Sequence, residues 1–404
     1  MKQIEGGVCA AKGFTASGIY CGIRKKNNKN DLALIFSKVP AHAAAVYTTN
    51  LVKGAPLTVT KQHIADGIAQ AVLCNSGNAN TCNSDGIEIA EKMSALAAEK
   101  LGISKDDVVV ASTGVIGQKL NITPIANGMD KLVGALSEAG GDEAAKAIMT
   151  TDTVMKKIAV EFAIGGKTCH MGGIAKGSGM IHPNMATMLV FLTTDAAISA
   201  PMLQKALSHD VQKTFNMLSV DGDTSTNDMV AILANGMAGN AEITEEGPAF
   251  DIFMQALNTI TIALCRSIAG DGEGATKLLE CDVTGAANEK TAAVVAKSVI
   301  TSSLLKAAMF GADANWGRVL CAIGYSGADL EVNKVDVAFQ SAKGILPVCQ
   351  NGAGVDFSEE TAKEILLEKE ITILVNLNSG NASATAWGCD LTYDYVKING
   401  DYRS

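Results

Sequence analysis

Short apolar runs that end in glycine-, asparagine- or serine-rich turns dominate the first third of the chain. Three of these runs predict β-strands that lead into loops, at residues 31–37 (DLALIFS), 43–49 (AAAVYTT) and 71–80 (AVLCNSGNAN). Residues 86–102 instead carry apolar side chains at helical spacing and end in glycine. This pattern predicts an α-helix, with Asp85 placed to cap its first turn.

Helices and strands remain mixed along the rest of the chain. Residues 108–117 (VVVASTGVIG) predict a strand that enters a glycine-bounded loop, and residues 151–195 predict a hairpin, a glycine-rich loop and a strand starting near Thr187. Further helices are expected at 124–140, 142–149, 201–218 and 249–270, and further strands at 335–339, 369–377 and 389–400. Because strands and helices do not alternate strictly, we expect a layered α/β or α+β fold.

Composition supports a packed globular chain and excludes several classes of protein. Of the 404 residues 48% are hydrophobic but only 4% aromatic, so the core must be built mainly from Ala, Val, Ile, Leu and Met. A net charge of −9 without a cluster of Lys and Arg argues against a nucleic-acid binder. We interpret the short run RKKNNK at 24–29 as a solvated loop. Apolar runs such as 188–192 are too short to cross a bilayer.

Cysteine usage and the N-terminal residues predict a cytosolic protein. The ten cysteines form no C-x-x-C pair and no zinc-like spacing with histidine. The first residues, MKQIEGGVCAAKGF, lack the apolar core of a signal peptide. We therefore expect the cysteines to be reduced and buried as small apolar residues.

Common catalytic motifs do not account for the chain. It has no G-x-x-x-x-G-K-[ST] phosphate loop and no G-x-S-x-G elbow, and GDGEG at 270–274 lacks dinucleotide-binding spacing. His182 lies close to Thr187 in sequence, but a structural role is the better interpretation than a Ser-His-Asp triad. The pentapeptide NSGNA occurs at 75–79 and again at 378–382. Shared turn chemistry and a pair of functional loops both remain open for this repeat.

The segment AKGSGMIHPNMATM, at 175–188, holds a candidate nucleophile. Taken alone, Thr187 is a β-branched residue that opens an apolar strand. Its surroundings suit chemistry: a glycine-rich loop with Lys176 allows close backbone approach to a ligand, and the small Ala186 leaves its carbonyl accessible to the next side chain.

Motifs spread along nearly the whole chain resemble the ornithine acetyltransferase/glutamate N-acetyltransferase family of arginine biosynthesis. They are ASTGVIG (111–117), IMTTDT (148–153), AKGSGM (175–180), PNMATM (183–188), DGEGATK (271–277), GADANWGR (311–318) and the C-terminal YVKINGDYRS. The resemblance implies self-cleavage between Ala186 and Thr187, giving an α chain of residues 1–186 and a β chain of residues 187–404. It also implies a helix–sheet–sheet–helix fold of the N-terminal-nucleophile type with a smaller C-terminal α/β part.

The same resemblance implies roles for individual residues. Thr187 would be the nucleophile, and its freed α-amine, with an ordinary pKa near 8, would act as the base. Thr113 and Gly114 would form the oxyanion hole. Substrate contacts would come from Thr150, Lys176, Thr187, Glu273, Asn399 and Ser404, with Lys176 suited to a carboxylate and Glu273 to an ammonium group.

The expected reaction moves an acetyl group from N2-acetylornithine to glutamate through an acetyl-Thr187 intermediate. The resemblance implies no metal and no cofactor, leaves acetyl-CoA open as a second donor, and suggests a heterotetramer of two α and two β chains in the cytoplasm. Two alternatives remain at this point. The same nucleophile would serve an amidase that transfers the acyl group to water, and a processed amino-acid-binding protein would need the pocket without an acyl-enzyme.

Overall fold

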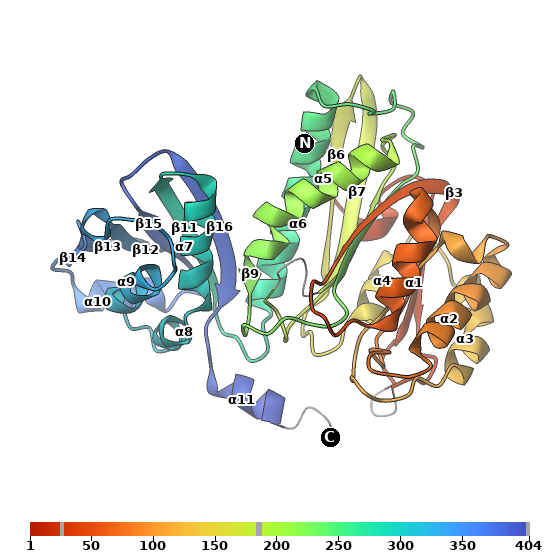
Figure 1. Ribbon diagram of the computed structural model, residues 1–404, viewed down its shortest axis with the longest axis horizontal. Helices are drawn as coiled ribbons and strands as arrows, with labels where there is room; N and C mark the ends of the chain where they lie inside the picture. Colours follow the sequence, from red (N-terminus) through yellow and green to blue (C-terminus); the bar gives the residue numbers. More distant parts are fainter. Residues whose placement is uncertain (25–27, 183–187, 401–404) are drawn as a thin grey trace. The chain divides into compact units, whose positions relative to one another are not determined.

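The computed structural model describes residues 1–24, 28–182 and 188–400, and it divides into two compact units (Figure 1). Unit 1 comprises Met1–Gly177, Asn184–Gln212 and Thr224–Leu264; unit 2 comprises Ser178–Pro183, Lys213–Asp223 and Cys265–Ser404. Each unit takes residues from both sides of position 186. The compact units therefore do not coincide with the α and β chains that the sequence predicts.

Unit 1 is built on a sheet of nine strands within the described residues. Eight of them follow one path: β1 (Lys2–Ile4), β6 (Lys156–Ile164), β7 (Lys167–Lys176), β8 (Leu189–Thr194), β10 (Met229–Ala234), β3 (Leu32–Tyr47), β4 (Ile68–Asn75) and β5 (Val108–Ser112). The ninth, β2 (Phe14–Ile19), pairs with β3 beside this path. The parallel pairs β8–β10 and β4–β5 stand among antiparallel ones, so the sheet is mixed.

Strand β3 joins the two halves of this sheet. The sequence predicts separate strands at 31–37 and 43–49, and this prediction is wrong: the structure has one strand whose register shifts between Phe36 and Ala41. Pro40 lies inside the shift and has no N–H for a ladder bond, so the strand bulges there without ending. The first half of β3 pairs with β2, and the second half pairs with β10.

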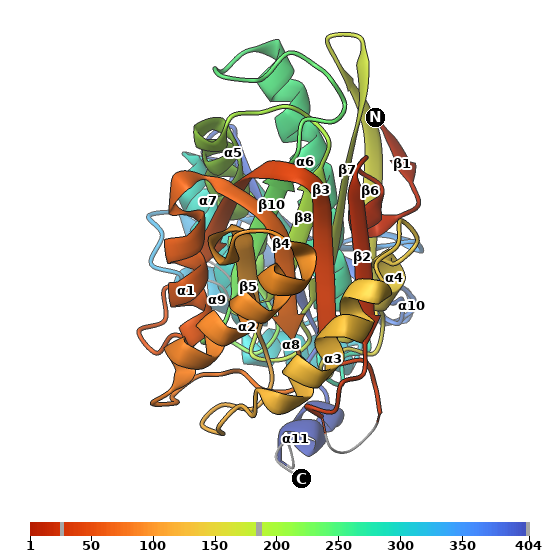
Figure 2. The same cartoon turned by 90° about the vertical axis from the view of Figure 1, so that its right-hand side faces the viewer.

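The two halves of the sheet share an inner core, which produces the expected layers. Buried residues of β3, β4 and β5 and of β7, β8 and β10 belong to the same cluster, together with helix α4 (Gly141–Ile148). A second cluster fills the outer face of β3–β5, against α2 (Gly86–Leu101) and α3 (Thr123–Gly134). Helices α5 (Ala200–Lys213) and α6 (Pro248–Gly270) lie on the opposite side of unit 1 from α2 and α3 (Figures 1 and 2). The predicted mixed α/β, helix–sheet–sheet–helix arrangement is therefore confirmed.

Glycine allows α4 to approach β2 very closely. A Cβ added at Gly18 of β2 would lie 2.0 Å from the backbone oxygen of Glu143 and 2.9 Å from the Cβ of Ala147. Alanines on α4 complete the contact and are almost fully buried. An aromatic-poor core of this kind depends on small residues, because backbone atoms fill the space that large side chains occupy elsewhere.

We expect Gly18→Ala to destabilise the protein by about 1–3 kcal/mol, because the added methyl group meets backbone that cannot rotate away. The matched control is Gly134→Ala at the end of α3, where an added Cβ meets no atom within 4 Å. That control should be neutral or stabilise by up to ~1 kcal/mol. Urea unfolding of both variants measures the difference, and equal stabilities would contradict the close packing of α4 on β2.

Unit 2 has a seven-stranded sheet within the described residues, and helices cover one of its faces. The strand order is β14 (Ala353–Gly354), β13 (Gly344–Gln350), β12 (Asp336–Ser341), β15 (Glu370–Asn376), β11 (Leu278–Ala286), β16 (Ala382–Cys389) and β9 (Leu218–Ser219). Its helices are α7 (Glu289–Thr301), α8 (Ser303–Phe310), α9 (Trp316–Gly324), α10 (Glu359–Leu366) and α11 (Tyr393–Gly400). Burial alternates along β15, as expected for a sheet with one covered face.

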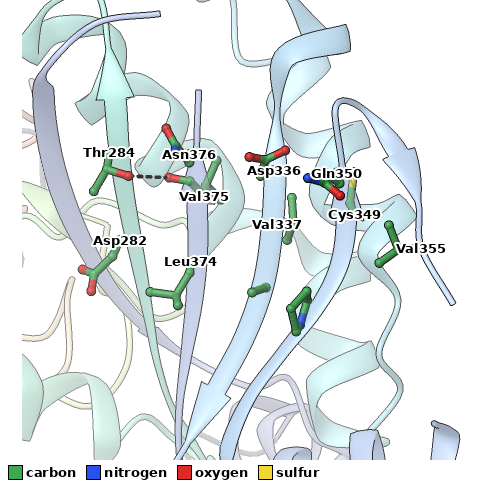
Figure 3. A pocket seen from close by; sticks show the side chains of 12 residues that line it. Asp282, Thr284, Asp336, Val337, Cys349, Gln350, Val355, Leu374, Val375 and Asn376 are labelled. Atoms are coloured by element: carbon green, nitrogen blue, oxygen red, sulfur yellow. Dashed lines mark hydrogen bonds between the residues drawn. The ribbon is translucent and has the colours of Figure 1, made fainter. Parts of the chain in front are cut away.

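The other face of this sheet carries a cavity of about 480 Å³ (Figure 3). Polar side chains of three adjacent strands line part of it, including Asp282, Asp336 and Asn376. None of the predicted site residues that the structure describes lines this cavity.

Three local predictions need correction. Helix α5 ends at Lys213 rather than near residue 218, because Thr214 leaves helical geometry with φ −124° and ψ −93°. Residues 389–400 were expected to be a strand, but only Cys389 belongs to one and α11 follows. Asp85 does precede α2, but its side chain makes no capping hydrogen bond. Gly102 ends that helix with φ 69°, as predicted.

Two observations bear on the expected cellular location. Helix α6 is, among the described residues, the single unbroken helix with the length and hydropathy of a membrane span, and half of its apolar window is buried in the fold. A core helix has the same properties. All ten cysteines, each in the described part of the chain, are free thiols. Most are buried as expected, but Cys82 and Cys321 are exposed.

Candidate active site

Two of the predicted motifs meet where β4 and β5 end. These strands are parallel and in register, with Asn75 beside Ser112, so the loops that follow them leave the same edge of the sheet. The loops are bonded together: Asn78 forms a bridge with Val115, and the N–H of Ala79 donates to the carbonyl of Val115 over 3.1 Å. The carboxyl ends of parallel strands are a common place for ligand sites.

Thr113 and Gly114, the residues predicted to form the oxyanion hole, lie at the start of the second loop. The N–H of Thr113 donates to the carbonyl of Asn75 over 2.9 Å, which fixes the backbone ahead of Gly114. Gly114 has φ 129°, and a Cβ there would lie 2.8 Å from the backbone nitrogen of Asn78. Only glycine fits this conformation and this approach.

The repeated pentapeptide has different surroundings in its two copies. In the first copy, Asn75 ends a strand, and its side-chain oxygen accepts from the N–H groups of Gly77 and Asn78. In the second, which belongs to unit 2, Asn378 has φ 48° and its own N–H donates to Asn376. The sequence left two interpretations of this repeat open. Because the first asparagine makes different bonds in the two copies, the structure favours shared turn residues over a pair of equivalent functional loops.

Asn227 holds both loops and was not identified from the sequence. Its side-chain amide donates to the carbonyl of Ala79 over 2.6 Å and to the carbonyl of Ser112 over 3.0 Å. Its oxygen accepts from the hydroxyl of Thr81 over 2.6 Å. The buried amide thus ties the residues flanking the predicted oxyanion hole to the segment before β10. An isolated asparagine in DGDTSTND carries no sequence signal for this role.

Asp228, next in the chain, is buried with one carboxylate oxygen that has no hydrogen-bond partner among the described residues. Burial raises the pKa of this carboxyl group well above its usual range, although a hydrogen bond from Ser225 and the charge of Lys176 act in the opposite direction. The raised pKa favours the neutral acid, because burial disfavours the charged carboxylate.

Asp152 connects two further motifs through a buried carboxylate. It accepts from the N–H of Thr150 over 2.9 Å and from the N–H of Gly177 over 2.8 Å. Lys156 donates to the same group over 2.6 Å, and neither of these two charged side chains is exposed. Burial would raise the pKa of Asp152, but Lys156, Lys176 and the Gly177 N–H outweigh it and lower the pKa to about 2. The motif TTDT contains this residue, yet the sequence does not distinguish its role.

We expect Asp152→Asn to cost about 3–5 kcal/mol at pH 7, because the buried ammonium group of Lys156 would lose the opposite charge that Asp152 supplies. Since folding lowers the pKa of Asp152, its contribution is present above pH ~4 and lost as the pH falls toward 2. The stability difference between wild type and variant should therefore shrink over that range.

Denaturant unfolding of both proteins at several pH values measures this prediction. Asp142→Asn is the control, because its carboxylate pairs with Lys157 near the surface, and it should cost less than ~1 kcal/mol. A difference between wild type and Asp152→Asn that stays constant from pH 5 to pH 2 would contradict the assignment.

Lys176 and Thr150 complete the part of the site that lies in unit 1. Lys176 ends β7, and its ammonium group lies 3.5 Å from the hydroxyl of Thr113. Thr150 borders a cavity of about 370 Å³, which Thr113, Gly114 and Lys176 do not line. Arg24 also lines it, and its guanidinium donates to Ser76 and to the carbonyl of Met149. Arg24 is thus held by the fold, which corrects the expectation of a solvated loop at its position.

Unit 2 brings two other predicted residues together. The side-chain amide of Asn399, on α11, donates to the carboxylate of Glu273 over 2.8 Å. The N–H of Glu273 donates to the carbonyl of Ser178 over 2.9 Å, so the DGEG and AKGSGM motifs meet here. The glycine-rich DGEG run therefore places the carboxylate of Glu273 beside Asn399.

Ala186, Thr187 and Ser404 lie outside the described residues. The strand that follows Thr187 is well defined: Leu189 opens β8 and pairs with Lys176 on one side and Met229 on the other. The N–H of Met229 also donates to the carbonyl of Met188 over 2.9 Å. The chain is thus bonded to β10 at the second residue after the predicted cut, and it is paired with both β7 and β10 from the third.

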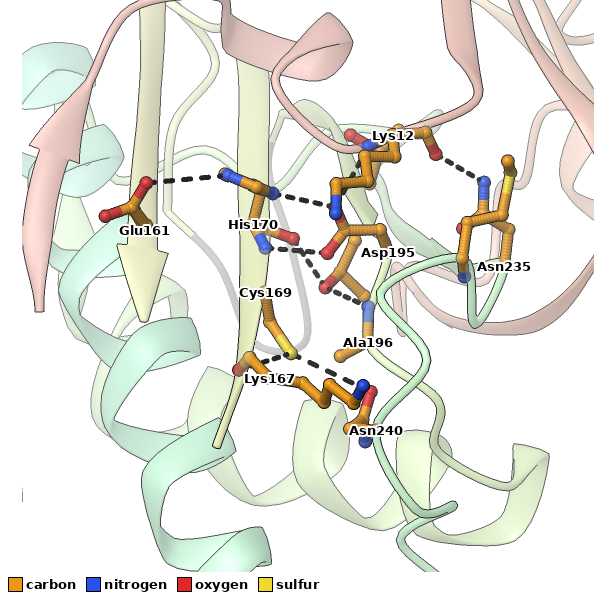
Figure 4. Close-up of polar contacts among 12 residues, drawn as sticks. Lys12, Glu161, Lys167, Cys169, His170, Asp195, Ala196, Asn235 and Asn240 are labelled. Carbon is orange, nitrogen blue, oxygen red and sulfur yellow. Dashed lines mark hydrogen bonds and ion pairs between the residues drawn. The ribbon is translucent and has the colours of Figure 1, made fainter. Parts of the chain in front are cut away.

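The histidines found near or within these strands have structural partners. Nδ1 of His182 lies 3.0 Å from the hydroxyl of Ser219, and burial together with the charge of Lys297 lowers the pKa of His182 to about 4. His170, farther along β7, lies 2.8 Å from the buried Asp195 (Figure 4). Asp195 also accepts from the backbone N–H of Lys12, so this cluster joins chain segments at the far end of the strand.

Comparison with known proteins identifies the family. The model of the ArgJ family matches residues 15–404. The chain belongs to the ArgJ family. It is 51% identical, over the whole of both chains, to the arginine biosynthesis bifunctional protein ArgJ of Caldanaerobacter subterraneus subsp. tengcongensis, and equally to that of Symbiobacterium thermophilum. The crystal structure of ArgJ from Bacillus halodurans has 48% identity and a TM-score of 0.50, covering 52% of this chain and 97% of the solved one.

Membership of the ArgJ family makes the chain an acetyltransferase of arginine biosynthesis. The resemblance and the enzyme class predicted from the sequence are therefore confirmed. A binding protein without catalysis is excluded, and acetyl transfer takes precedence over acyl transfer to water.

Proposed function

We propose that the chain cleaves itself between Ala186 and Thr187, and that Thr187 then carries the acetyl group from N2-acetylornithine to glutamate. The observation that supports this most strongly is the register of β8. Leu189 pairs with Lys176, and the ammonium group of Lys176 lies 3.5 Å from the Thr113 hydroxyl. The strand that begins just after Thr187 thus starts beside the residues expected to stabilise an oxyanion.

The length of a solved relative also supports a cut near the middle. The ArgJ chain from Bacillus halodurans is matched over 97% of its length by only 52% of this chain. The solved chain thus has about the length expected for one of the two cleavage products. The proposed α chain, residues 1–186, and β chain, residues 187–404, are each close to half of the sequence.

The chemistry needs only groups of the chain itself. The freed α-amine of Thr187 accepts the proton of its own hydroxyl as the oxygen attacks the acetyl carbonyl. The hydroxyl of Thr113 and the N–H of Gly114 donate to the oxyanion. The carbon–nitrogen bond of the substrate then breaks, and the departing nitrogen of ornithine takes the proton from the α-amine of Thr187. Ornithine is released, and the acetyl group remains on the Thr187 oxygen. The amine of glutamate attacks this ester, which returns the proton to Thr187 and releases N-acetylglutamate.

Substrate recognition uses charged side chains in this proposal. Lys176 binds a substrate carboxylate and Glu273 binds an ammonium group such as the ornithine side chain. Thr150, Asn399 and the C-terminal Ser404 complete the contacts. The hydrogen bonds to Asp152 and Ser178 that hold these residues support the assignment, because they fix Thr150 and Glu273 before substrate arrives.

The two products of cleavage stay together in this proposal. Strand β7 precedes the cut and β8 follows it, and they pair antiparallel over six residues of β7, from Met171 to Lys176. Strand β10, from the β chain, pairs in turn with β3 of the α chain. We propose that the unit formed in this way assembles into a cytoplasmic heterotetramer of two α and two β chains, working without a metal or cofactor.

Thr187→Ala should abolish both cleavage and acetyl transfer, because it removes the attacking oxygen from each reaction. Intact-mass spectrometry of purified wild type should show two fragments that meet at Ala186 and Thr187, while the variant should remain a single chain of 404 residues. Incubation with N2-acetylornithine should add one acetyl mass to the wild-type β chain. Acetyl transfer by the purified variant would refute the mechanism.

Thr113→Ala should lower kcat about 10²–10³-fold with a much smaller change in KM, because it removes a donor used mainly in the transition state. Thr113→Ser keeps the hydroxyl and is the matched control, expected within about tenfold of wild type. Steady-state kinetics on fully cleaved protein measure both. An equal loss in the two variants would assign the effect to packing.

The relatives named above are described as bifunctional. We propose that the second activity here is N-acetylation of glutamate by acetyl-CoA on the same threonine. Purified, cleaved protein should then release free CoA thiol only when acetyl-CoA and glutamate are both present. The Thr187→Ala variant should release no CoA thiol under either condition.

A further inference from the structure

Asp221 binds the backbone of the segment that leads to the proposed cut. Its two carboxylate oxygens accept from consecutive N–H groups, that of Met180 over 2.6 Å and that of Ile181 over 2.8 Å. Bonds from N–H groups to an ionised carboxylate are stronger than bonds between neutral groups. All three residues belong to unit 2, so these contacts lie within one compact unit.

The backbone at this anchor is unusual. Met180 has φ 57°, a left-handed conformation that few residues other than glycine adopt. Such a conformation persists only where surrounding contacts enforce it, and it often marks a functional site. Here the enforcing contact is the carboxylate of Asp221, because it accepts the N–H of Met180 itself.

The neighbours of Asp221 extend the anchor toward the cut. The N–H of Val220 donates to the carbonyl of Ile181 over 2.6 Å, and Ser219 contacts the ring of His182 over 3.0 Å. Residues 219–221 thus hold residues 180–182 one after another. Only residues 183–186 separate this anchored stretch from Thr187.

We propose that Asp221 is a positioning residue for self-cleavage, acting through the backbone of residues 180–182. The inference rests on the proposed function, because it assumes the cut between Ala186 and Thr187. In that reaction the Thr187 hydroxyl oxygen bonds to the Ala186 carbonyl carbon, the peptide C–N bond breaks, and the proton moves from oxygen to the leaving nitrogen. Water then hydrolyses the ester, which leaves a carboxylate on Ala186 and an amine on Thr187.

Attack of a side chain on the preceding carbonyl needs a restricted backbone geometry, and each freely rotating residue before the scissile bond makes that geometry rarer. By holding residues 180–182, Asp221 restricts the backbone that leads toward the cut. It touches neither the attacking oxygen nor the carbonyl, and its effect should therefore be on the cleavage rate and not on acetyl transfer by protein that is already cut.

Asp221→Asn is the direct test. The amide keeps one acceptor oxygen but turns an NH₂ group toward a backbone N–H, so cleavage should slow about tenfold to hundredfold. Purified full-length precursor is followed by intact mass over time, with thermal unfolding as the check on folding. The cleaved fraction of the variant should keep wild-type kcat and KM for acetyl transfer.

Tyr395→Phe is the matched control. The Tyr395 hydroxyl donates to the same carboxylate over 3.3 Å, so its removal changes the surroundings of Asp221 but leaves both backbone bonds intact. This variant should cleave at the wild-type rate. If Asp221→Asn fails to fold, Asp221→Glu replaces it, because the longer side chain keeps the charge but displaces the oxygens, and cleavage should again be slowed.

The outcomes separate this inference from the proposed function. Wild type that is cut at Ala186/Thr187, together with a folded Asp221 variant cut at the same rate, overturns the role of Asp221 alone. Wild type that stays intact, or is cut elsewhere, overturns the proposed function and the inference with it. Slow cleavage in the folded Asp221 variant and normal cleavage in Tyr395→Phe support both.

Discussion

The buried carboxylate of Asp152 is the interaction on which the site in unit 1 depends. A charge without solvent access is stable only when it is fully paired, and Lys156 supplies the opposite charge. The remaining acceptor capacity goes to the N–H groups of Thr150 and Gly177. The carboxylate that neutralises Lys156 therefore also fixes two backbone segments that carry predicted substrate contacts. One segment directly follows Lys176, and the other is at Thr150.

The second constraint is the close approach of backbone to backbone. The loops after β4 and β5 are near enough that Gly114 cannot carry a side chain, and the amide of Asn227 satisfies carbonyl groups in both. Rigid donors that are oriented before the substrate binds are the basis of electrostatic catalysis, because no reorganisation is needed during the reaction. Glycine and one buried amide provide this rigidity without any large side chain.

Local patterns in the sequence predicted much of the fold, and tertiary contacts decided the rest. The period of α2 and its final glycine were visible in the sequence, as was the hairpin before the glycine-rich loop. The helical state of 393–400 was not, since its β-branched and aromatic residues favour a strand locally. The bonds of Thr392 to Gly274 and of Tyr395 to Asp221 hold α11 in place. Pairing partners were likewise invisible, so β3 was expected to be two strands.

The same limit applies to the site. Motif resemblance predicted roles for Thr113, Lys176 and Glu273, because these residues occur within recognisable local motifs. It did not point to Asn227 or Asp221, which contact carbonyl and N–H groups brought to them from distant parts of the chain. Residues that act by holding backbone have no local signature, and only a three-dimensional structure shows them.

The crossing of the two chains in one sheet also has a consequence for the life of the enzyme. Strand β8 belongs to the proposed β chain but pairs with β7 of the α chain and with β10, which in turn pairs with β3. Before cleavage these pairings form within one molecule, and afterwards the same pairings would have to form between two. The proposed cleavage would therefore convert refolding from a first-order reaction within one chain into a second-order association of two chains, which is slow at low concentration. The chain would therefore need to fold before it is cut, and the cleaved enzyme would refold less readily than its precursor.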